Sequence, residues 1–306
     1  MKILYAGSSQ SSSLILESLI ASSNEVIGVI SQPDKRSKRG AAIEPSYVSS
    51  VAEKNNITVY KPQTLDENFK HTILKLNFDI LLVVAYGKIL PAWFLESPKK
   101  ESVNIHYSLL PKYRGASPIQ SALLNDEKVT GISLMKMTDG LDEGPVYFSH
   151  KQKISPKDNR STLEDKLTSL AIKNIDKDLS DIYLDKVVPI KQGSKNISYC
   201  KKIDKLSGKI NLDQEESDSV FRKYKAYYDW PGLYFEFKNL KIKIHGIDLK
   251  VKKNTNFMKN KFYFHDNLLH AKTIDGSIVI TYLQFPGKRI ISSNDAANSY
   301  ADFFID

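Results

Sequence analysis

Three polar residues, Asn104, His106 and Asp142, have the types and the spacing for chemistry on a carbonyl group. The run SVNIH (102–106) alternates, so Asn104 and His106 share one face of a strand near its C-terminal end. Asp142 lies between Gly140 and Gly144 in a loop that must turn tightly. Asn104 and a protonated His106 would donate hydrogen bonds to an oxygen that gains negative charge. Asp142 would keep His106 charged and help to manage the proton of an attacking amine.

The same residues also have ordinary structural interpretations. A single histidine at a strand end is more often a structural side chain, and an aspartate between glycines is more often a turn residue. Spacing alone does not bring Asp142 next to His106. His245, His265 and His270 lack the spacing of metal ligands, so we expect no zinc site and no other metal.

The elements that must position the trio alternate between strands and helices. Strands are predicted at 2–6, 25–31 and 79–87, with a helix at 12–22. The run 79–87 is apolar throughout, which is typical of a strand that is covered on both faces. This pattern predicts an α/β fold with a doubly wound, mostly parallel sheet, whose ligands bind at the carboxyl ends of the strands. The segment AGSSQSS is not a GxGxxG motif, which disfavours a dinucleotide site.

The second half of the chain changes character. Further strands at 131–137 and 144–154 precede a long amphipathic helix at 161–184, for which Ser161 is the expected N-cap. We expect a catalytic domain at 1–185, a polar linker at 186–203 and a second domain at 204–306. Short strands within 232–251 and 261–283, with a turn at Asp275-Gly276 and helices near 215–227 and 294–304, predict that this second domain is a small antiparallel β-barrel of the OB-like kind.

Composition narrows the class of protein. The 306 residues are 41% hydrophobic, which is enough for a sizeable core, and the single cysteine, Cys200, excludes an intramolecular disulfide. No apolar run is long enough to cross a membrane, and the first residues read as a strand without a targeting signal. We therefore expect a cytoplasmic protein, most simply bacterial and monomeric. The net charge of +9 favours a polyanionic partner, although a solvated basic surface explains it equally well.

Two segments carry a resemblance to a known family. NIHYSLLPKYRGASPIQ (104–120), followed by GLDEG (140–144), resembles the formyltransferases that use 10-formyltetrahydrofolate. The resemblance implies that Asn104, His106 and Asp142 are the catalytic trio, that 10-formyltetrahydrofolate is the formyl donor, and that no metal takes part. VVAYGKIL (83–90) is similar to the segment that lines the folate pocket. The folate-binding residues that the resemblance implies are Tyr86, Gly87, Ile89, Leu90, Ser108, Leu109, Leu110, Pro111, Gly140 and Leu141.

Other matches concern the formyl acceptor. SQPDKRSKRG (31–40) resembles a loop that reaches the acceptor end of tRNA in the family members that formylate methionyl initiator tRNA for translation initiation. YKAYYDWPGLYF (224–235) and LQFPGKR (283–289) resemble the C-terminal domain of the same members. The tRNA-binding residues that we expect are Lys35, Arg36, Lys38, Arg39, Lys241, Lys243, Lys250 and Lys252. The segment SSQSSS (8–13) departs from the family pattern, in which Thr-Pro-Asp-Phe-Ala or a close variant follows the first glycine, so the placement of the acceptor stays open.

Three alternatives remain at this point. The first alternative is a formyltransferase for a small amine, such as an amino sugar nucleotide or a purine precursor. The second is a hydrolase of formyl-folate. The third alternative is an RNA-binding protein on an inactive formyltransferase scaffold. A basic C-terminal domain argues against the first two, and the intact trio argues against the third.

Overall fold

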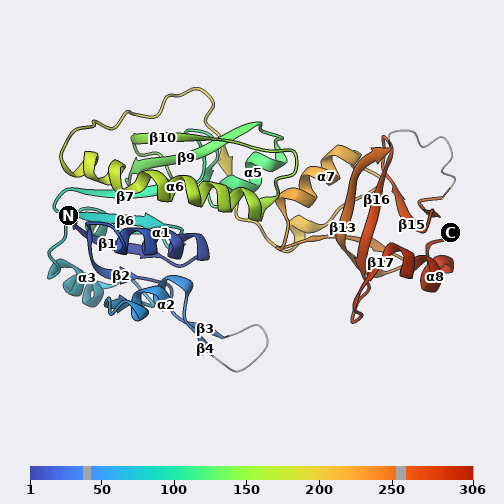
Figure 1. Ribbon diagram of the computed structural model, residues 1–306, viewed down its shortest axis with the longest axis horizontal. Coiled ribbons are helices and arrows are strands. Elements are labelled where there is room, and N and C mark those ends of the chain that lie inside the picture. Colours follow the sequence, from blue (N-terminus) through green and yellow to red (C-terminus); the bar gives the residue numbers. More distant parts are fainter. Residues whose placement is uncertain (37–42, 253–259, 306) are drawn as a thin grey trace. The chain divides into compact units, whose positions relative to one another are not determined.

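Two β-sheets organise the chain, and each belongs to a separate unit of a computed structural model (Figure 1). The structure describes residues 1–36, 43–252 and 260–305. The first unit consists of Met1–Pro118, Lys128–Ile154 and Leu163–Lys201. The second unit consists of Ile119–Glu127, Ser155–Thr162 and Lys202–Asp306.

The first unit is built on a seven-stranded sheet with the strand order β10-β9-β7-β6-β1-β2-β5. Five neighbouring strands run parallel, in the order β7, β6, β1, β2 and β5. At the β7 side, β9 pairs antiparallel with β7, and β10 pairs antiparallel with β9. This arrangement confirms the predicted doubly wound, mostly parallel sheet. The strands are β1 (Lys2–Gly7), β2 (Glu25–Ile30), β5 (Val59–Tyr60), β6 (Ile80–Val84), β7 (Glu101–His106), β9 (Val129–Lys136) and β10 (Val146–Lys153).

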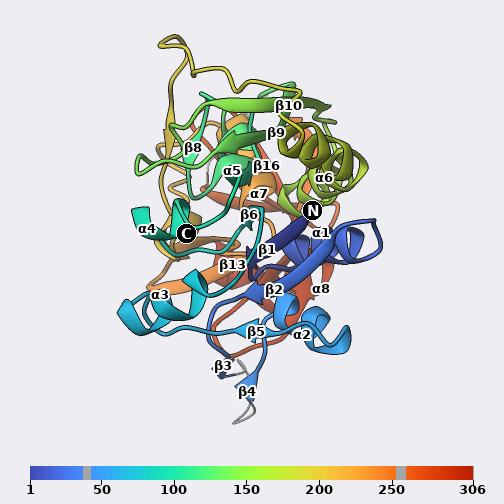
Figure 2. The same cartoon turned by 90° about the vertical axis from the view of Figure 1, so that its left-hand side faces the viewer.

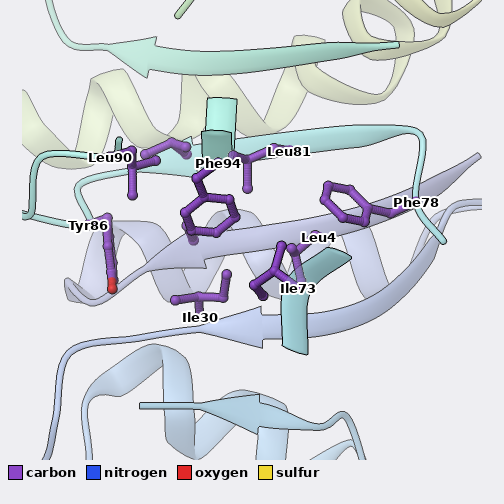
Figure 3. Packing of buried hydrophobic residues seen from close by; sticks show 10 residues of the cluster. Leu4, Ile30, Ile73, Phe78, Leu81, Tyr86, Leu90 and Phe94 are labelled. Atoms are coloured by element: carbon purple, nitrogen blue, oxygen red, sulfur yellow. The ribbon is translucent and has the colours of Figure 1, made fainter. Parts of the chain in front are cut away.

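Helices cover both faces of this sheet (Figure 2). One face carries α1 (Gln10–Ile20), α2 (Tyr47–Lys54) and α6 (Arg160–Tyr183), and the other carries α3 (Glu67–Leu74) and α4 (Ala92–Leu95). Side chains alternate along a strand. The Leu4 side chain of β1 therefore points to one face, where it lies in a buried cluster with Ile73 of α3 and Phe94 of α4 (Figure 3). The sheet is therefore buried on both sides, which explains its continuous apolar runs.

Most expected boundaries differ from the structure by one to three residues, and two of these differences have a visible cause. Helix α6 begins at Arg160, and its cap is Asn159 instead of the expected Ser161: the Asn159 side chain accepts a hydrogen bond from the Thr162 amide at 3.0 Å. Strand β6 ends at Val84, before the expected residue 87, because Ala85 adopts a φ of +48° and turns the chain out of the sheet.

The second unit contains an antiparallel sheet of six strands, in the order β12-β13-β16-β15-β14 with β17 paired to β16. Aromatic rings of Phe235, Phe262 and Phe304 pack in its core. The antiparallel prediction is confirmed, and within the described residues no pairing of β12 with β14 is found that would close the sheet into a barrel. The elements are η1 (Leu206–Gly208), α7 (Ser217–Ala226), β12 (Leu233–Phe237), β13 (Leu240–Lys252), β14 (Phe262–His265), β15 (Leu268–Lys272), β16 (Ser277–Gln284), β17 (Ile290–Ser292) and α8 (Ser293–Phe304), and α5 (Pro118–Leu124) lies almost wholly in this unit.

Short strand pairs complete the description. In the first unit, β8 (Arg114–Gly115) pairs in parallel with β11 (Tyr199–Cys200). The β11 strand lies in the segment 186–203 that we expected to be a polar linker, and this segment up to Lys201 belongs to the first unit. The pair β3 (Lys35–Arg36) and β4 (Ile43–Glu44) flanks residues 37–42, which lie outside the described residues.

Candidate active site

Strand β7 carries Asn104 and His106 in the middle of the first sheet. Asn104 is aligned with Val83 of β6 and with Met135 of β9, and His106 is aligned with Ser133 of β9. Since the two residues are two positions apart on a strand, their side chains lie on the same face. Asn104 is half-buried and His106 is buried, so the sheet holds both side chains firmly near the carboxyl end of β7.

The hydrogen bond of His106 determines which ring nitrogen carries the proton. Its Nε2 lies 2.8 Å from the backbone oxygen of Tyr113, and a carbonyl oxygen only accepts, so Nε2 is the donor. Nδ1 lies 3.6 Å from Oδ2 of Asp142. The structure therefore brings Asp142 next to His106, which spacing alone did not establish.

The charge of His106 differs from the expectation. The side chain is only 6% exposed, and burial lowers the pKa of His106. The Asp142 carboxylate acts in the opposite direction and raises this pKa, but by less than burial lowers it. A pKa below the ordinary value of 6.5 favours a neutral ring at neutral pH, with a hydrogen on Nε2 and a lone pair on Nδ1, instead of the expected cation.

The loop of Asp142 is held in an uncommon backbone conformation. Asp142 has a φ of +51°, and its Oδ2 accepts a hydrogen bond of 2.7 Å from the Gly115 amide. At Gly144 a Cβ atom would lie 1.8 Å from the backbone oxygen of Lys136, so only glycine allows this close approach to β9. The Gly-rich sequence therefore brings the carboxylate against the sheet edge.

The turn at 113–115 contacts both members of the pair. Tyr113 accepts the hydrogen bond from His106, and Gly115 donates to Asp142. Gly115 has a φ of +112°, and a Cβ atom there would lie 2.4 Å from the backbone oxygen of Cys200 on β11. The Tyr-Arg-Gly turn of the motif is therefore the common support of His106 and Asp142.

Sequence reasoning missed residues that support this turn from the expected linker. The Ser198 oxygen accepts a hydrogen bond from the Arg114 amide, and the Ser198 hydroxyl accepts one from the Tyr113 amide, both at 2.9 Å. Gln192 bonds to Arg114 and to the Asp142 loop. Their only signal in the sequence is polarity, which is equally typical of a solvated linker.

The ten residues expected to bind folate fall into three groups by burial. Tyr86, Leu90 and Ser108 are buried, and Figure 3 shows Tyr86 and Leu90 in the same core cluster as Phe94. The side chains of Ile89 and Leu141 are exposed, at 93% and 59%. Gly87 lies in a turn with a φ of +80°, and Gly140 is exposed. The remaining residues, Leu109, Leu110 and Pro111, are half-buried.

The residues expected to bind tRNA lie in two places. Lys35 and Arg36 form β3, and Lys38 and Arg39 lie outside the described residues. Lys241 and Lys243 are exposed on β13. The same strand contains Lys250 and Lys252.

The described residues also bear on metal binding and on membrane spanning. In the part of the chain that the structure describes, no group of three His, Cys, Asp or Glu side chains is placed to hold a metal ion. Across the same residues, no helix has both the length and the apolar character of a membrane span.

Comparisons with known proteins identify the family of this chain. Residues 1–177 match the Formyl transferase family and residues 202–301 match its C-terminal domain. Methionyl-tRNA formyltransferase of Sulfurihydrogenibium sp. is 36% identical over 98% of this chain and 97% of its own length. The enzyme of the same name from Buchnera aphidicola is 37% identical over 99% of this chain and 97% of its own length. A sugar 3N-formyl transferase, solved with dTDP and 5-N-formyl-THF, superposes with a TM-score of 0.67 at 25% identity and covers 94% of this chain and 99% of its own. The chain belongs to the formyl transferase family.

Proposed function

We propose that this protein transfers a formyl group from 10-formyltetrahydrofolate to the α-amino group of methionyl initiator tRNA, for translation initiation. The observation that carries the proposal is the contact between His106 and Asp142, 36 positions apart in sequence, with 3.6 Å between Nδ1 and Oδ2. The relatives named methionyl-tRNA formyltransferase support the acceptor, because their similarity runs through both units of the chain.

The neutral state of His106 suggests a revised division of labour in the trio. Nδ1 of His106 takes a proton from the attacking amine, and the imidazolium that forms is stabilised by Asp142. The Asn104 amide donates to the formyl oxygen as it gains negative charge. A carbon–nitrogen bond forms between the formyl carbon and the methionyl amine, and the bond from that carbon to N10 of the folate breaks. His106 returns its proton to N10, which balances the step and leaves tetrahydrofolate and formylmethionyl-tRNA.

The exposed apolar side chains support the proposed folate contacts. Ile89 and Leu141 follow the turns at Gly87 and Gly140, and an isolated side chain as exposed as Ile89 gains by contact with a flat pterin ring. In this proposal the backbone of Tyr86 and Gly87 and the Ser-Leu-Leu-Pro segment (108–111) supply hydrogen-bonding groups. The buried side chains of Tyr86, Leu90 and Ser108 keep these turns in place.

The basic residues support a polyanionic acceptor. We assign phosphate contacts to residues 35–39 and to Lys241, Lys243, Lys250 and Lys252 of the C-terminal domain, 204–306, with residues 1–185 as the catalytic domain. Phosphate contacts of this kind supply affinity and orientation. We place the protein in the bacterial cytoplasm, as a monomer.

A small amine is the competing acceptor. The solved sugar formyl transferase shows that the fold accommodates such a family member. The chain is less similar to that enzyme, at 25% identity, than to the two methionyl-tRNA formyltransferases, at 36% and 37%. This chain also has a net charge of +9, which favours a polyanionic acceptor over a small amine.

The test is a competition between acceptors. The full chain is incubated with 10-formyltetrahydrofolate and equal concentrations of methionyl initiator tRNA and an amino sugar nucleotide, and formylated products are quantified by mass spectrometry after release of the amino acid from the tRNA. We expect formylmethionine as the dominant product, formed about 1000-fold more slowly by the variant His106→Ala. Formylation of the sugar alone would reject methionyl-tRNA as the acceptor, and formate release without either product would indicate a hydrolase.

A further inference from the structure

Gln192 connects the Asp142 loop to Arg114 of the 113–115 turn through four side-chain hydrogen bonds. Its Nε2 donates to the backbone oxygens of Asp142 and Gly144, both at 2.8 Å. Its Oε1 accepts from Nε and Nη2 of Arg114, at 3.0 and 2.8 Å. A glutamine amide has two donor hydrogens and two acceptor lone pairs, so all four are used.

Arg114 makes this amide part of a larger network. Its guanidinium is buried, and it also pairs with Glu143 at 3.2 Å and donates to the Tyr199 hydroxyl at 3.1 Å. A buried charge is strongly destabilising unless it is paired and hydrogen-bonded, so Arg114 depends on these partners. Through Gln192, the turn that holds His106 is fastened to the loop that holds Asp142.

The backbone of Asp142 gives this fastening a specific task. A φ of +51° is an uncommon conformation for a residue with a side chain, and it persists only where neighbouring contacts fix it. The side chain of Asp142 is fixed by the Gly115 amide, and its own carbonyl oxygen is fixed by Gln192. The two contacts therefore fix both the side chain and the backbone of Asp142.

We propose that Gln192 is a positioning residue for formyl transfer, which holds the Asp142–Gly144 loop against Arg114 and so keeps the Asp142 carboxylate beside Nδ1 of His106. Gln192 acts through Asp142 and does not touch the reacting atoms. The inference rests on the proposed function, because it concerns the transfer step of that reaction.

The experiment separates the two halves of the Gln192 amide. Gln192→Glu keeps an acceptor for Arg114 but loses both donors to the loop. Gln192→Leu loses the acceptor and both donors. The matched control is Gln152→Leu on β10, where the glutamine amide donates to the neighbouring Lys153 oxygen and to no other group among the described residues. Each variant is assayed in a single turnover with saturating 10-formyltetrahydrofolate and methionyl-tRNA, together with the affinity for each substrate and the thermal midpoint.

We expect Gln192→Glu and Gln192→Leu to lower the single-turnover rate by about 100-fold, because a misplacement of about 1 Å in a catalytic group has this effect. Substrate affinities should stay within about twofold, and Gln192→Glu should unfold near the wild-type temperature because Arg114 keeps a partner. Gln152→Leu should retain the wild-type rate. A wild-type rate in Gln192→Glu would overturn the proposal.

A double-mutant cycle tests whether Gln192 acts through Asp142. In the background Asp142→Asn, adding Gln192→Leu should lower the rate by less than about threefold, because residues that act as a unit are not additive. A further loss as large as in the wild-type background would show an independent structural role and overturn the proposal. If the wild-type chain does not formylate methionyl-tRNA at all, the proposed function fails first. An active wild type with unaffected Gln192 variants rejects only this inference.

Discussion

The His106–Asp142 corner of the first unit and the β12–β13 hairpin of the second unit hold their polar groups in opposite ways. In the corner, His106 is buried, and both His106 and Asp142 are bonded to the backbone of the 113–115 turn. On the hairpin, Lys241 and Lys243 are exposed at alternate positions of β13, and the Lys241 ammonium lies 3.5 Å from the centre of the Tyr234 ring.

The difference reflects two physical requirements. Proton transfer needs atoms fixed to within a fraction of an ångström in a site from which water is largely excluded. Attraction to a phosphate backbone acts over about 8 Å at physiological salt and tolerates mobile side chains. Fixed groups should therefore control the rate of transfer, and exposed groups should control affinity for the acceptor.

The largest expected effect is that of His106→Ala. Loss of the proton acceptor should lower the single-turnover rate by about 1000-fold, within the range for general acid–base catalysis. The affinity for methionyl-tRNA should change little, because the phosphate contacts that supply this affinity are assigned to basic residues elsewhere in the chain. Circular dichroism serves as the control for folding. A rate within about threefold of wild type in a folded variant would break the assignment of the corner to catalysis.

Asp142→Asn should lower the rate by about 100-fold and should also move its pH dependence. Burial lowers the pKa of His106 below its ordinary value of 6.5, so the wild-type rate should fall with acid only below that pH. The carboxylate raises the pKa of His106, so its removal lowers this pKa further and shifts the acid limb to lower pH. The pH–rate profiles of both proteins are the measurement. A shift of the acid limb to higher pH would contradict the assigned pair.

Ile89→Asp should weaken binding of the formyl donor by about 10- to 100-fold, because burial of an apolar side chain contributes about 1.5–3 kcal/mol. Since Ile89 is 93% exposed, the substitution should not alter the free energy of unfolding. The matched control is Leu74→Asp, at an exposed leucine of α3. Titration of both variants with the folate measures the effect. Equal donor affinity in the two variants would remove Ile89 from the folate site.

The smallest expected effect is on the hairpin. Lys241→Ala with Lys243→Ala should weaken tRNA binding by about 10-fold and reduce the slope of log affinity against log salt by about 0.7–0.9 for each lost contact. The control pair is Lys54→Ala with Lys75→Ala, at exposed lysines of the first unit. Binding is measured by filter retention from 50 to 200 mM salt. An unchanged slope in the hairpin variant would show that this surface does not contact phosphate.

Local patterns predicted much of the fold and the shared face of Asn104 and His106. The parallel strands were visible because a strand that is covered on both faces has a continuous apolar run, as in β6. Asn104 and His106 share a face because strand alternation requires it. The end of β6 at Val84 was not predictable, because alanine is not a residue type that favours the left-handed conformation of Ala85.

The supports of the site were hidden for a different reason. Gln192 and Ser198 lie in a polar segment with Pro189 and Gly193. Such a composition is equally typical of a solvated linker and of a segment that is hydrogen-bonded to a catalytic loop, as this one is. The neutral state of His106 was also hidden, because it follows from the extent of burial and not from the presence of a nearby acid. Both features are set by contacts between residues far apart in the chain.

The most direct test measures two quantities on the same preparations of His106→Ala and the double variant Lys241→Ala/Lys243→Ala. These are the dissociation constant for methionyl initiator tRNA and the single-turnover rate of formyl transfer at saturating tRNA and donor. We predict that the His106 variant binds like wild type and has lost the transfer rate, and that the lysine variant binds more weakly and transfers at the wild-type rate once saturated. A lysine variant with a reduced saturated rate, or a His106 variant with normal transfer, would contradict the separation of catalysis from acceptor binding.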